Sequence, residues 1–390
     1  MSSSTPKRIL PTIIFSQFAG TSLWFAGNAI IGELQADWAL PTGAIASVTS
    51  AVMFGFIIGT FVFALFSIAD RFKPSGVFFI CAILGALANA AIILLPASYL
   101  LLLVCRFLTG LFLAGIYPVG MKIASDWFAG KLGKALGYLV GALVVGTAFP
   151  HLLNYYGSTL SWKFVLTGTS TLAVLGGISM LLLVGEGPHR KKGASFKPAR
   201  IIEVFQKKDF RSAAFGYFGH MWELYTFWAF LPLIITFYNQ SQGAALNPSL
   251  WSFIIIAGGA LSCVLGGIYS VRLGSAKVAF GFLSTSGLMC LLSPLFFMLP
   301  PPFFLSLLVI WGLAVIGDSA QFSSLNAQTA PKELVGTALT IVVSIGFLLT
   351  IPSIQLLGWL ADNIDTRGLL LTLAIGPVFG LLNTKNLLNR

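Results

Sequence analysis

Charged side chains are scarce in this chain of 390 residues. Asp, Glu, Lys and Arg together make up 9% of it, against about 25% in a typical soluble domain. Hydrophobic residues make up 57% of the chain, and the mean hydropathy is +0.90. So little polar surface excludes a soluble globular protein. We therefore expect an all-α integral membrane protein.

Groups that carry cofactor or hydrolytic chemistry are also missing. The four cysteines lie inside apolar runs without CxxC spacing, which indicates neither a disulfide framework nor a zinc site. The chain has no Walker element, no G-x-S-x-G elbow and no cluster of metal ligands. An ATP-driven pump or a hydrolase has no support here, and we predict neither enzymatic activity nor a cofactor.

What the chain does have is a series of long apolar runs. They do not alternate with period two, which excludes a transmembrane barrel. At roughly 20–25 residues per crossing, the chain has room for about twelve helices. The first run follows Lys7-Arg8 and continues to about Ile31, too long for a cleaved signal peptide. We predict spans at 9–31, 44–69, 76–96, 98–121, 133–154, 162–184, 212–238, 248–270, 276–299, 303–328, 334–359 and 368–387.

Lys and Arg gather in every second break between these runs. With the N-terminus inside, twenty of the 23 basic residues fall on the inner side, and only Lys163 and Arg367 fall outside. This bias predicts that both termini are cytoplasmic in an inner or plasma membrane. The net charge of +11 is then a topology signal rather than a sign of nucleic acid. The expected partners are a small-molecule substrate and membrane lipid, and we expect a monomer.

One long basic break divides the chain. We predict an N-terminal bundle of six helices over 1–184, a basic cytoplasmic linker over 185–211 and a C-terminal bundle of six helices over 212–390. The linker is interpreted as a solvated connection, with added attraction to anionic headgroups. Similar polar turns follow the second helix of each half, at 69–73 and 267–277. They indicate two repeats related about the membrane normal.

These turns resemble the cytoplasmic motif G-x-L-A-D-R-x-G-R-R/K of the major facilitator superfamily, and the resemblance covers essentially the whole chain. It implies twelve helices in two pseudo-symmetric bundles of six. Phe66 and Lys73 stand where the motif has glycine, and Val271 replaces its Asp. The resemblance implies that the turn residues latch the two halves together, the alternative being a polar turn without a gating role. These gating candidates are Asp70, Arg71 and Arg272.

Two further motifs refine the resemblance. Arg106 and Gly110 match the family's R-x-x-x-G element, while Ala142 stands where its drug antiporters carry proline, which counts against drug efflux. The stretch from Tyr117 to Phe128 resembles the nitrate-porter and organic-anion symporter branch.

By the resemblance, the first, fourth, seventh and tenth helices line a central cavity. Polar residues at helical spacing in these same runs point to the same helices. The substrate-binding candidates are Arg106, Tyr117, Gln17, Trp24, Asn28, Trp222, Tyr225 and Gln321. For most of the aromatic ones, simple packing is the competing interpretation.

Two carboxyls and a histidine in apolar runs are the candidates for proton coupling. Charged groups inside the bilayer are costly and need a reason to be there. Glu223, with His220 one turn before it, and Asp318 could take up and release protons. Their alternatives are an ion pair of Glu223 with Arg106, a packed histidine, and a helix–helix contact of Asp318. Arg106 cannot deprotonate, so its burial demands an anionic partner or ligand.

These features predict a secondary active transporter that is coupled to protons and moves a small organic anion or zwitterion by alternating access. The alternative within transport is proton-driven efflux of cationic or amphipathic compounds. A membrane receptor or enzyme without transport is the remote alternative, since the chain shows neither an added soluble domain nor a catalytic cluster.

Overall fold

The computed structural model describes residues 6–128, 132–157, 160–190, 200–363 and 366–388. Every regular element in these ranges is a helix, which confirms the predicted all-α class. Eleven helices in these ranges are long and apolar enough to cross a membrane. A twelfth apolar helix, α1 (Ile9–Thr21), is shorter.

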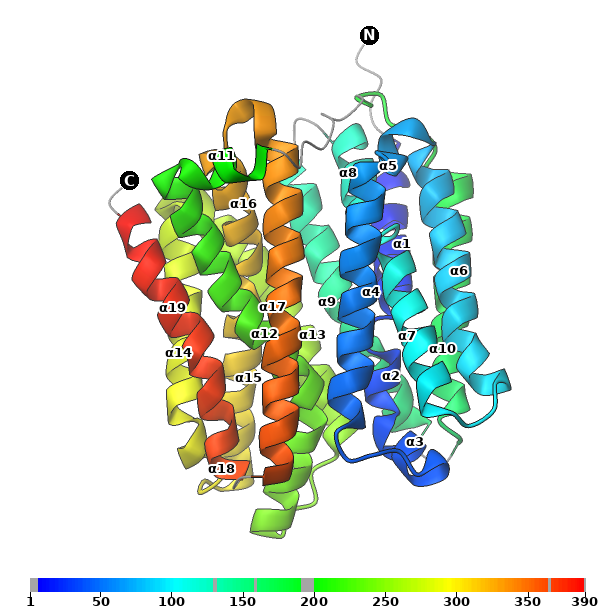
Figure 1. Cartoon of the computed structure of the whole chain (residues 1–390), viewed down its shortest axis with the longest axis vertical. Coiled ribbons are helices and arrows are strands. Elements are labelled where there is room, and N and C mark those ends of the chain that lie inside the picture. The colour runs from blue at the N-terminus through cyan, green and yellow to red at the C-terminus, as the bar shows by residue number, and fades with distance from the viewer. Residues whose placement is uncertain (1–5, 129–131, 158–159, 191–199, 364–365, 389–390) are drawn as a thin grey trace. The chain divides into compact units, whose positions relative to one another are not determined.

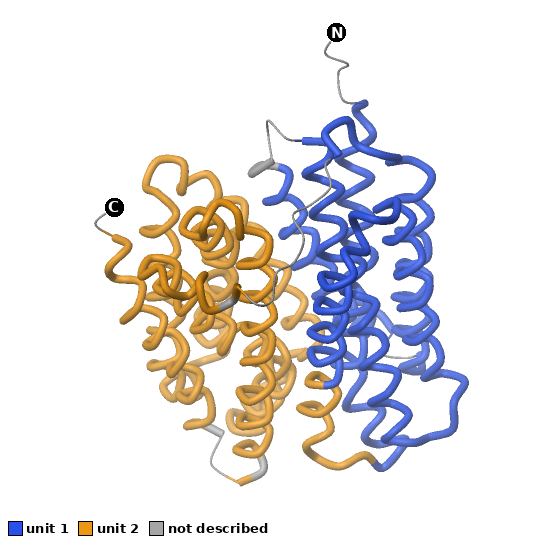
Figure 2. Tube along the Cα trace, turned by 45° about the horizontal axis from the view of Figure 1, so that its top comes forward, with its two compact units in different colours: residues 1–39, 51–195 blue, residues 40–50, 196–390 orange. Residues whose placement is uncertain are grey.

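The chain forms two compact units (Figure 2). The first unit comprises Met1–Ala39 and Ala51–Ser195, and the second comprises Leu40–Ser50 and Phe196–Arg390. Each unit is described separately below.

The first unit is built around α1, which packs on α9 and α10, while α10 also packs on α6. The elements after α1 are α2 (Ala26–Ala29), α3 (Ile31–Trp38), α4 (Ala44–Leu65), α5 (Ile68–Arg71), α6 (Pro74–Leu94), α7 (Tyr99–Leu113), α8 (Tyr117–Trp127), α9 (Leu132–Tyr156) and α10 (Lys163–Leu183).

The second unit is built around the long helix α12 (Lys208–Gln242), which lies beside α17 and α19 (Figure 1). Helix α11 (Ile201–Gln206) and the start of α12 fall within the predicted linker. The remaining elements are α13 (Pro248–Leu273), α14 (Ser275–Phe296), α15 (Pro301–Gly317), α16 (Ser319–Thr329), η3 (Lys332–Leu334), α17 (Val335–Asn363), α18 (Thr366–Leu369), η4 (Leu370–Ala374), α19 (Ile375–Thr384) and η5 (Lys385–Leu387).

The first crossing is interrupted rather than continuous. Helix α1 ends at Thr21 and α2 begins at Ala26, so residues 22–25 lie outside both helices. With 13 residues, α1 is about 20 Å long, less than the roughly 30 Å of a hydrocarbon core. The predicted span 9–31 therefore consists of two helical pieces and a break.

Two other predicted cavity helices are also interrupted. Residues 114–116 separate α7 from α8, and Pro118 occupies the first turn of α8, where its missing N–H costs nothing. Asp318 is both the last cap of α15 and the first cap of α16. Breaks inside a membrane leave backbone groups that need partners from the protein.

Candidate functional site

Glu223 lies in the interior of the second unit and is fully buried. Trp311 Nε1 of α15 donates to its Oε1 at 2.5 Å, and Ser286 Oγ of α14 donates to its Oε2 at 2.9 Å. Cys290 Sγ, also on α14, lies 3.4 Å from Oε1. The carboxyl thus joins three helices through neutral donors.

His220 and Asp318 form a second buried contact in the same unit. Nδ1 of His220 lies 2.7 Å from Oδ1 of Asp318, and the side chains are 1% and 0% exposed. Among the described residues, His220 Nε2 and Asp318 Oδ2 have no hydrogen-bond partner. The pair therefore keeps one nitrogen and one oxygen available for a proton or a ligand.

The three predicted proton carriers thus share one bundle interior. His220 and Glu223 are one turn apart on α12, and Asp318 sits at the break between α15 and α16. Where the second unit is described, no Lys or Arg lies within ion-pair distance of either carboxyl. The remaining titratable side chains close to them are the thiols of Cys290 on α14 and Cys263 on α13.

Arg106 is fully buried in the first unit, where it binds the break in the first crossing. One guanidinium nitrogen donates to the carbonyl of Trp24 and to that of Leu23 at 3.2 Å. The other donates to Asn89 Oδ1 at 3.1 Å. Within the described part of this unit, no carboxylate lies within ion-pair distance, and Nε has no partner. Arg106 therefore holds neutral acceptors and keeps its charge uncompensated there.

Asn89 extends this network to α10. Its Nδ2 lies 3.0 Å from Ser170 Oγ, 3.1 Å from Thr169 Oγ1 and 3.3 Å from the Leu166 carbonyl. The network ties the first crossing to α6, α7 and α10.

The other candidates of the first unit lie on the first crossing and at the start of α8. Gln17 is fully buried, and Gly120 of α8 packs directly against its amide. The Trp24 ring packs on Phe56 at 4.9 Å and on Tyr117 of α8 at 6.5 Å between centroids. Asn28 is 2% exposed.

The other candidates of the second unit point to different neighbours. Trp222 Nε1 donates to the Thr372 carbonyl at 3.2 Å, and the Tyr225 ring packs on Phe347 at 5.2 Å. Gln321, on α16, is 3% exposed. Trp222 and Tyr225 therefore lie against η4 and α17, whereas Glu223 lies against α14 and α15.

The gating candidates have different environments. Asp70 pairs with Lys122 of α8 at 3.0 Å, and Lys122 lies 3.8 Å from Asp126. Arg71 is exposed. Arg272 is exposed in the last turn of α13, where a cation is favourable to the helix dipole.

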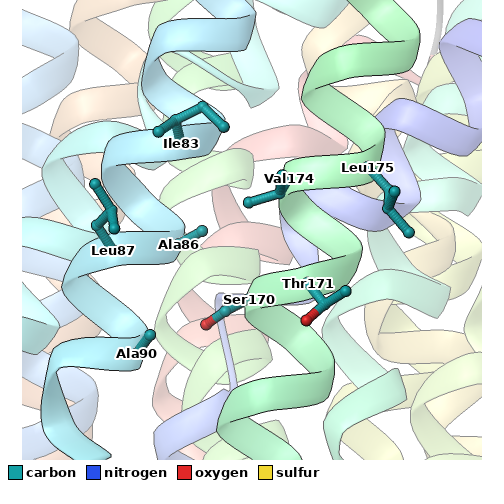
Figure 3. Close-up of a pocket in the computed structure, with 8 residues that line it drawn as sticks. All are labelled: Ile83, Ala86, Leu87, Ala90, Ser170, Thr171, Val174 and Leu175. Atoms are coloured by element: carbon teal, nitrogen blue, oxygen red, sulfur yellow. The ribbon is translucent and has the colours of Figure 1, made fainter. Parts of the chain in front are cut away.

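A groove of about 280 Å³ opens between α6 and α10 (Figure 3). Its walls are apolar apart from the hydroxyls of Ser170 and Thr171, and it contains none of the predicted site residues. Its lining comprises Ile83, Ala86, Leu87, Ala90, Ser170, Thr171, Val174 and Leu175.

The partners of the site residues were missed at the sequence level. Asn89 is the one amide in its apolar run, which was the available signal. Ser286 and Cys290 are four residues apart on one helix, but such small residues are common in membrane helices. Trp311 carries no signal that separates it from other buried tryptophans.

Comparisons with known proteins agree with this architecture. The chain is 26% identical over 267 residues to the uncharacterised protein Cj0987c of Campylobacter jejuni, covering 63% of this chain and 78% of that protein. It is 33% identical over 134 residues to the niacin transporter NiaP of Acinetobacter baylyi, covering 31% of this chain and 29% of that protein.

Solved structures share the fold over nearly the whole chain. The nucleoside transporter NupG has a TM-score of 0.72 at 12% identity, covering 98% of this chain and 99% of that one. The human organic anion transporter MFSD10 has a TM-score of 0.69 at 13% identity, covering 98% and 100%. The family model of the Major Facilitator Superfamily matches residues 12–354. With that match over most of the chain and the fold described above, the protein belongs to the major facilitator superfamily and is a multi-pass membrane transporter rather than an enzyme.

Proposed function

We propose that the transporter couples solute movement to protons through Asp318, His220 and Glu223. The observation that carries this proposal is the His220–Asp318 contact, fully buried and 2.7 Å long, without a Lys or Arg beside it in the described part of the second unit. An isolated buried carboxylate is strongly unfavourable. A proton shared within the pair removes that cost, whereas its release requires access to water or a new cationic partner.

The two carboxyls have different roles in this proposal. Glu223 accepts from Trp311 and Ser286, so both of its oxygens have donors. Asp318 has His220 as its side-chain partner, and its Oδ2 has no hydrogen-bond partner among the described residues. In this proposal Asp318 and His220 take up and release the proton. Glu223 links α12 to α14 and α15, so its hydrogen bonds change when these helices move during transport.

The proposed solute is a small organic anion or zwitterion. Arg106 supports it, because its buried charge has no carboxylate partner within the described part of its own unit. An anionic ligand would supply the missing charge through a charge-assisted hydrogen bond to Nε. The niacin transporter among the relatives makes nicotinate the first probe.

Efflux of a cationic or amphipathic compound remains the alternative, because the same carboxyls could receive a cation. In the proposed orientation the protein lies in an inner or plasma membrane with both termini on the cytoplasmic side. It follows from the distribution of Lys and Arg.

The test is uptake of labelled nicotinate into proteoliposomes with and without an inward proton gradient. Coupling predicts that the gradient accelerates uptake by wild type and not by Asp318→Asn or His220→Gln, while solute exchange without a gradient persists. Ser323→Ala, an exposed position on α16, serves as the matched control. Gradient-driven uptake at wild-type rates in both variants would remove the proposal. Export of a cation such as tetraphenylphosphonium in exchange for protons that enter down their gradient would favour efflux instead.

A further inference from the structure

Helix α9 carries a row of polar side chains that the functions above do not use. Thr147, His151 and Asn154 are spaced i, i+4 and i+7, which places them on one face of the helix. Thr147 and His151 are both 0% exposed. Polar groups buried at this depth require hydrogen-bond partners.

The members of this row differ in whether they have hydrogen-bond partners. Asn154 Nδ2 donates to the Ala29 carbonyl of α2 at 2.7 Å. Both ring nitrogens of His151 and the hydroxyl of Thr147 have no partner among the described residues. A buried polar group without a hydrogen-bond partner is unfavourable. The row therefore holds three polar atoms whose energy a ligand would lower.

The row lies at the depth of the break in the first crossing. Gly146 packs against the Phe18 carbonyl and Thr21, while Asn154 reaches Ala29. Helices α1 and α9 thus run in the same direction, and His151 lies between these two contacts. At about 1.5 Å per residue it is roughly 7.5 Å beyond Gly146. Residues 22–25, where no helix continues, lie at this same depth.

Helix α1 also carries a similar group that faces α8. Gln17 is fully buried against Gly120 of α8, and neither atom of its amide has a partner in the described ranges. One turn before Gly120, Tyr117 packs on Trp24. The break is thus bordered by unsatisfied neutral polar groups and by aromatic rings.

We propose that α1, α8 and α9 form a binding site for the uncharged, hydrogen-bonding part of a flat solute. Imidazole, hydroxyl and amide groups can each donate and accept, and none of them carries a formal charge when the imidazole is neutral. They match a ring nitrogen, a carboxamide or a ring carbonyl, and the rings of Trp24 and Tyr117 match a planar body. The site rests on the proposed function only in that its ligand is the transported solute.

The test is thermal unfolding of the purified full-length protein with nicotinamide, nicotinate and uridine. Benzoate, which is flat and has no ring nitrogen, is the control compound. At least one of the three heteroaromatic probes should raise the Tm of wild type more than benzoate does. Stabilisation by none of them would overturn the ligand class.

The decisive variants are Thr147→Val and His151→Leu, because both remove groups that lack partners. We expect the Tm of the ligand-free protein to be unchanged or higher, and the affinity for the stabilising probe to fall about tenfold, the equivalent of one hydrogen bond of about 1.4 kcal/mol. His151→Gln should keep part of the affinity. Asn154→Leu, which removes a made hydrogen bond on the same face, should lower the Tm without ligand.

The opposite pattern would overturn the site. If Thr147→Val and His151→Leu lower the ligand-free Tm as Asn154→Leu does and leave the affinity intact, these groups hold buried water or structure instead. Proton coupling is read separately. Probe binding that depends on His151 without gradient-driven uptake leaves this inference standing and removes the coupling. Coupled uptake with unchanged affinity in both variants removes the site alone.

Discussion

A buried guanidinium at the break of a membrane helix is the residue-level feature that links sequence to architecture here. Arg106 was predicted from its sequence position to need an anion. In the structure its donors go to the carbonyls of Leu23 and Trp24 and to Asn89. Those two carbonyls lie within the interruption between α1 and α2. The residue therefore stabilises the break through its hydrogen bonds.

Arg106→Lys tests the structural part of this role. Lysine keeps the charge but lacks the planar fork that reaches acceptors on two sides. Hydrogen bonds to charged groups contribute about 1.5–3 kcal/mol each, so the loss of one or two should lower the free energy of unfolding by about 2–5 kcal/mol. Thermal unfolding of the ligand-free protein is the measurement. An unchanged Tm would show that the three contacts contribute little and that Arg106 serves a ligand alone.

Glu33 on α3, outside the apolar spans, yields a prediction of pH dependence. Burial, followed by the nearby charge of Asp37, raises the pKa of Glu33 above its ordinary value of 4.5, against an opposing interaction with the Trp162 backbone. A raised pKa means that the favourable contribution is present below about pH 4.5 and is lost as pH rises through the folded value. Glu33→Gln should therefore raise the Tm at neutral pH, and the difference should shrink toward pH 4.

Glu203 provides the matched contrast for this measurement. Its pKa is lowered by a hydrogen bond from Arg200, so Glu203→Gln should lower the Tm at neutral pH or leave it unchanged. A Tm difference for Glu33→Gln that is constant with pH would contradict the assignment.

At the scale of elements, close packing between helices depends on single glycines. A Cβ at Gly110 of α7 would collide with the Val52 carbonyl oxygen and lie 2.8 Å from its carbon, and Gly55 of α4 faces Phe107 in the same way. Small residues that let backbones approach are the main packing device of membrane helices. Gly110, which matches a family motif in the sequence, is thus required for a steric reason: a larger side chain would not fit against α4.

Gly110→Ala should destabilise the first unit by about 1–3 kcal/mol, the usual cost of overpacking. Gly137→Ala on α9 is the control, because a Cβ there meets nothing within 4 Å. Alanine in a helix is about 1 kcal/mol better than glycine, so the control should be neutral or stabilising. Equal Tm values for the two variants would contradict the packing argument.

At the scale of the whole molecule, the distribution of basic residues predicts the membrane orientation. Twenty of the 23 Lys and Arg fall on the predicted inner side. A green fluorescent protein fused to the C-terminus should therefore fluoresce, and alkaline phosphatase fused there should be inactive. Phosphatase fused after Ser161, between α9 and α10, should be active. The reverse pattern would invert the topology.

The sequence carried the class of the protein because the bilayer imposes a strict rule on composition. Long apolar runs with few charges can only be membrane helices, and their number and the division into two halves follow from simple counting. Glu223, His220 and Asp318 could also be singled out one by one, since ionisable groups in apolar runs are costly. Solute, direction and coupling stay predictions.

Only the tertiary structure decided which groups meet. It revealed the helix interruptions at residues 22–25 and at Asp318. The donors to Glu223 and the acceptors of Arg106 belong to other helices, and no local pattern encodes these contacts. His151 and Thr147 escaped notice for the same reason, because a lone histidine or threonine in an apolar run is ordinary. Spacing along one helix shows which face a residue occupies, whereas partners across helices depend on the packing of the whole bundle.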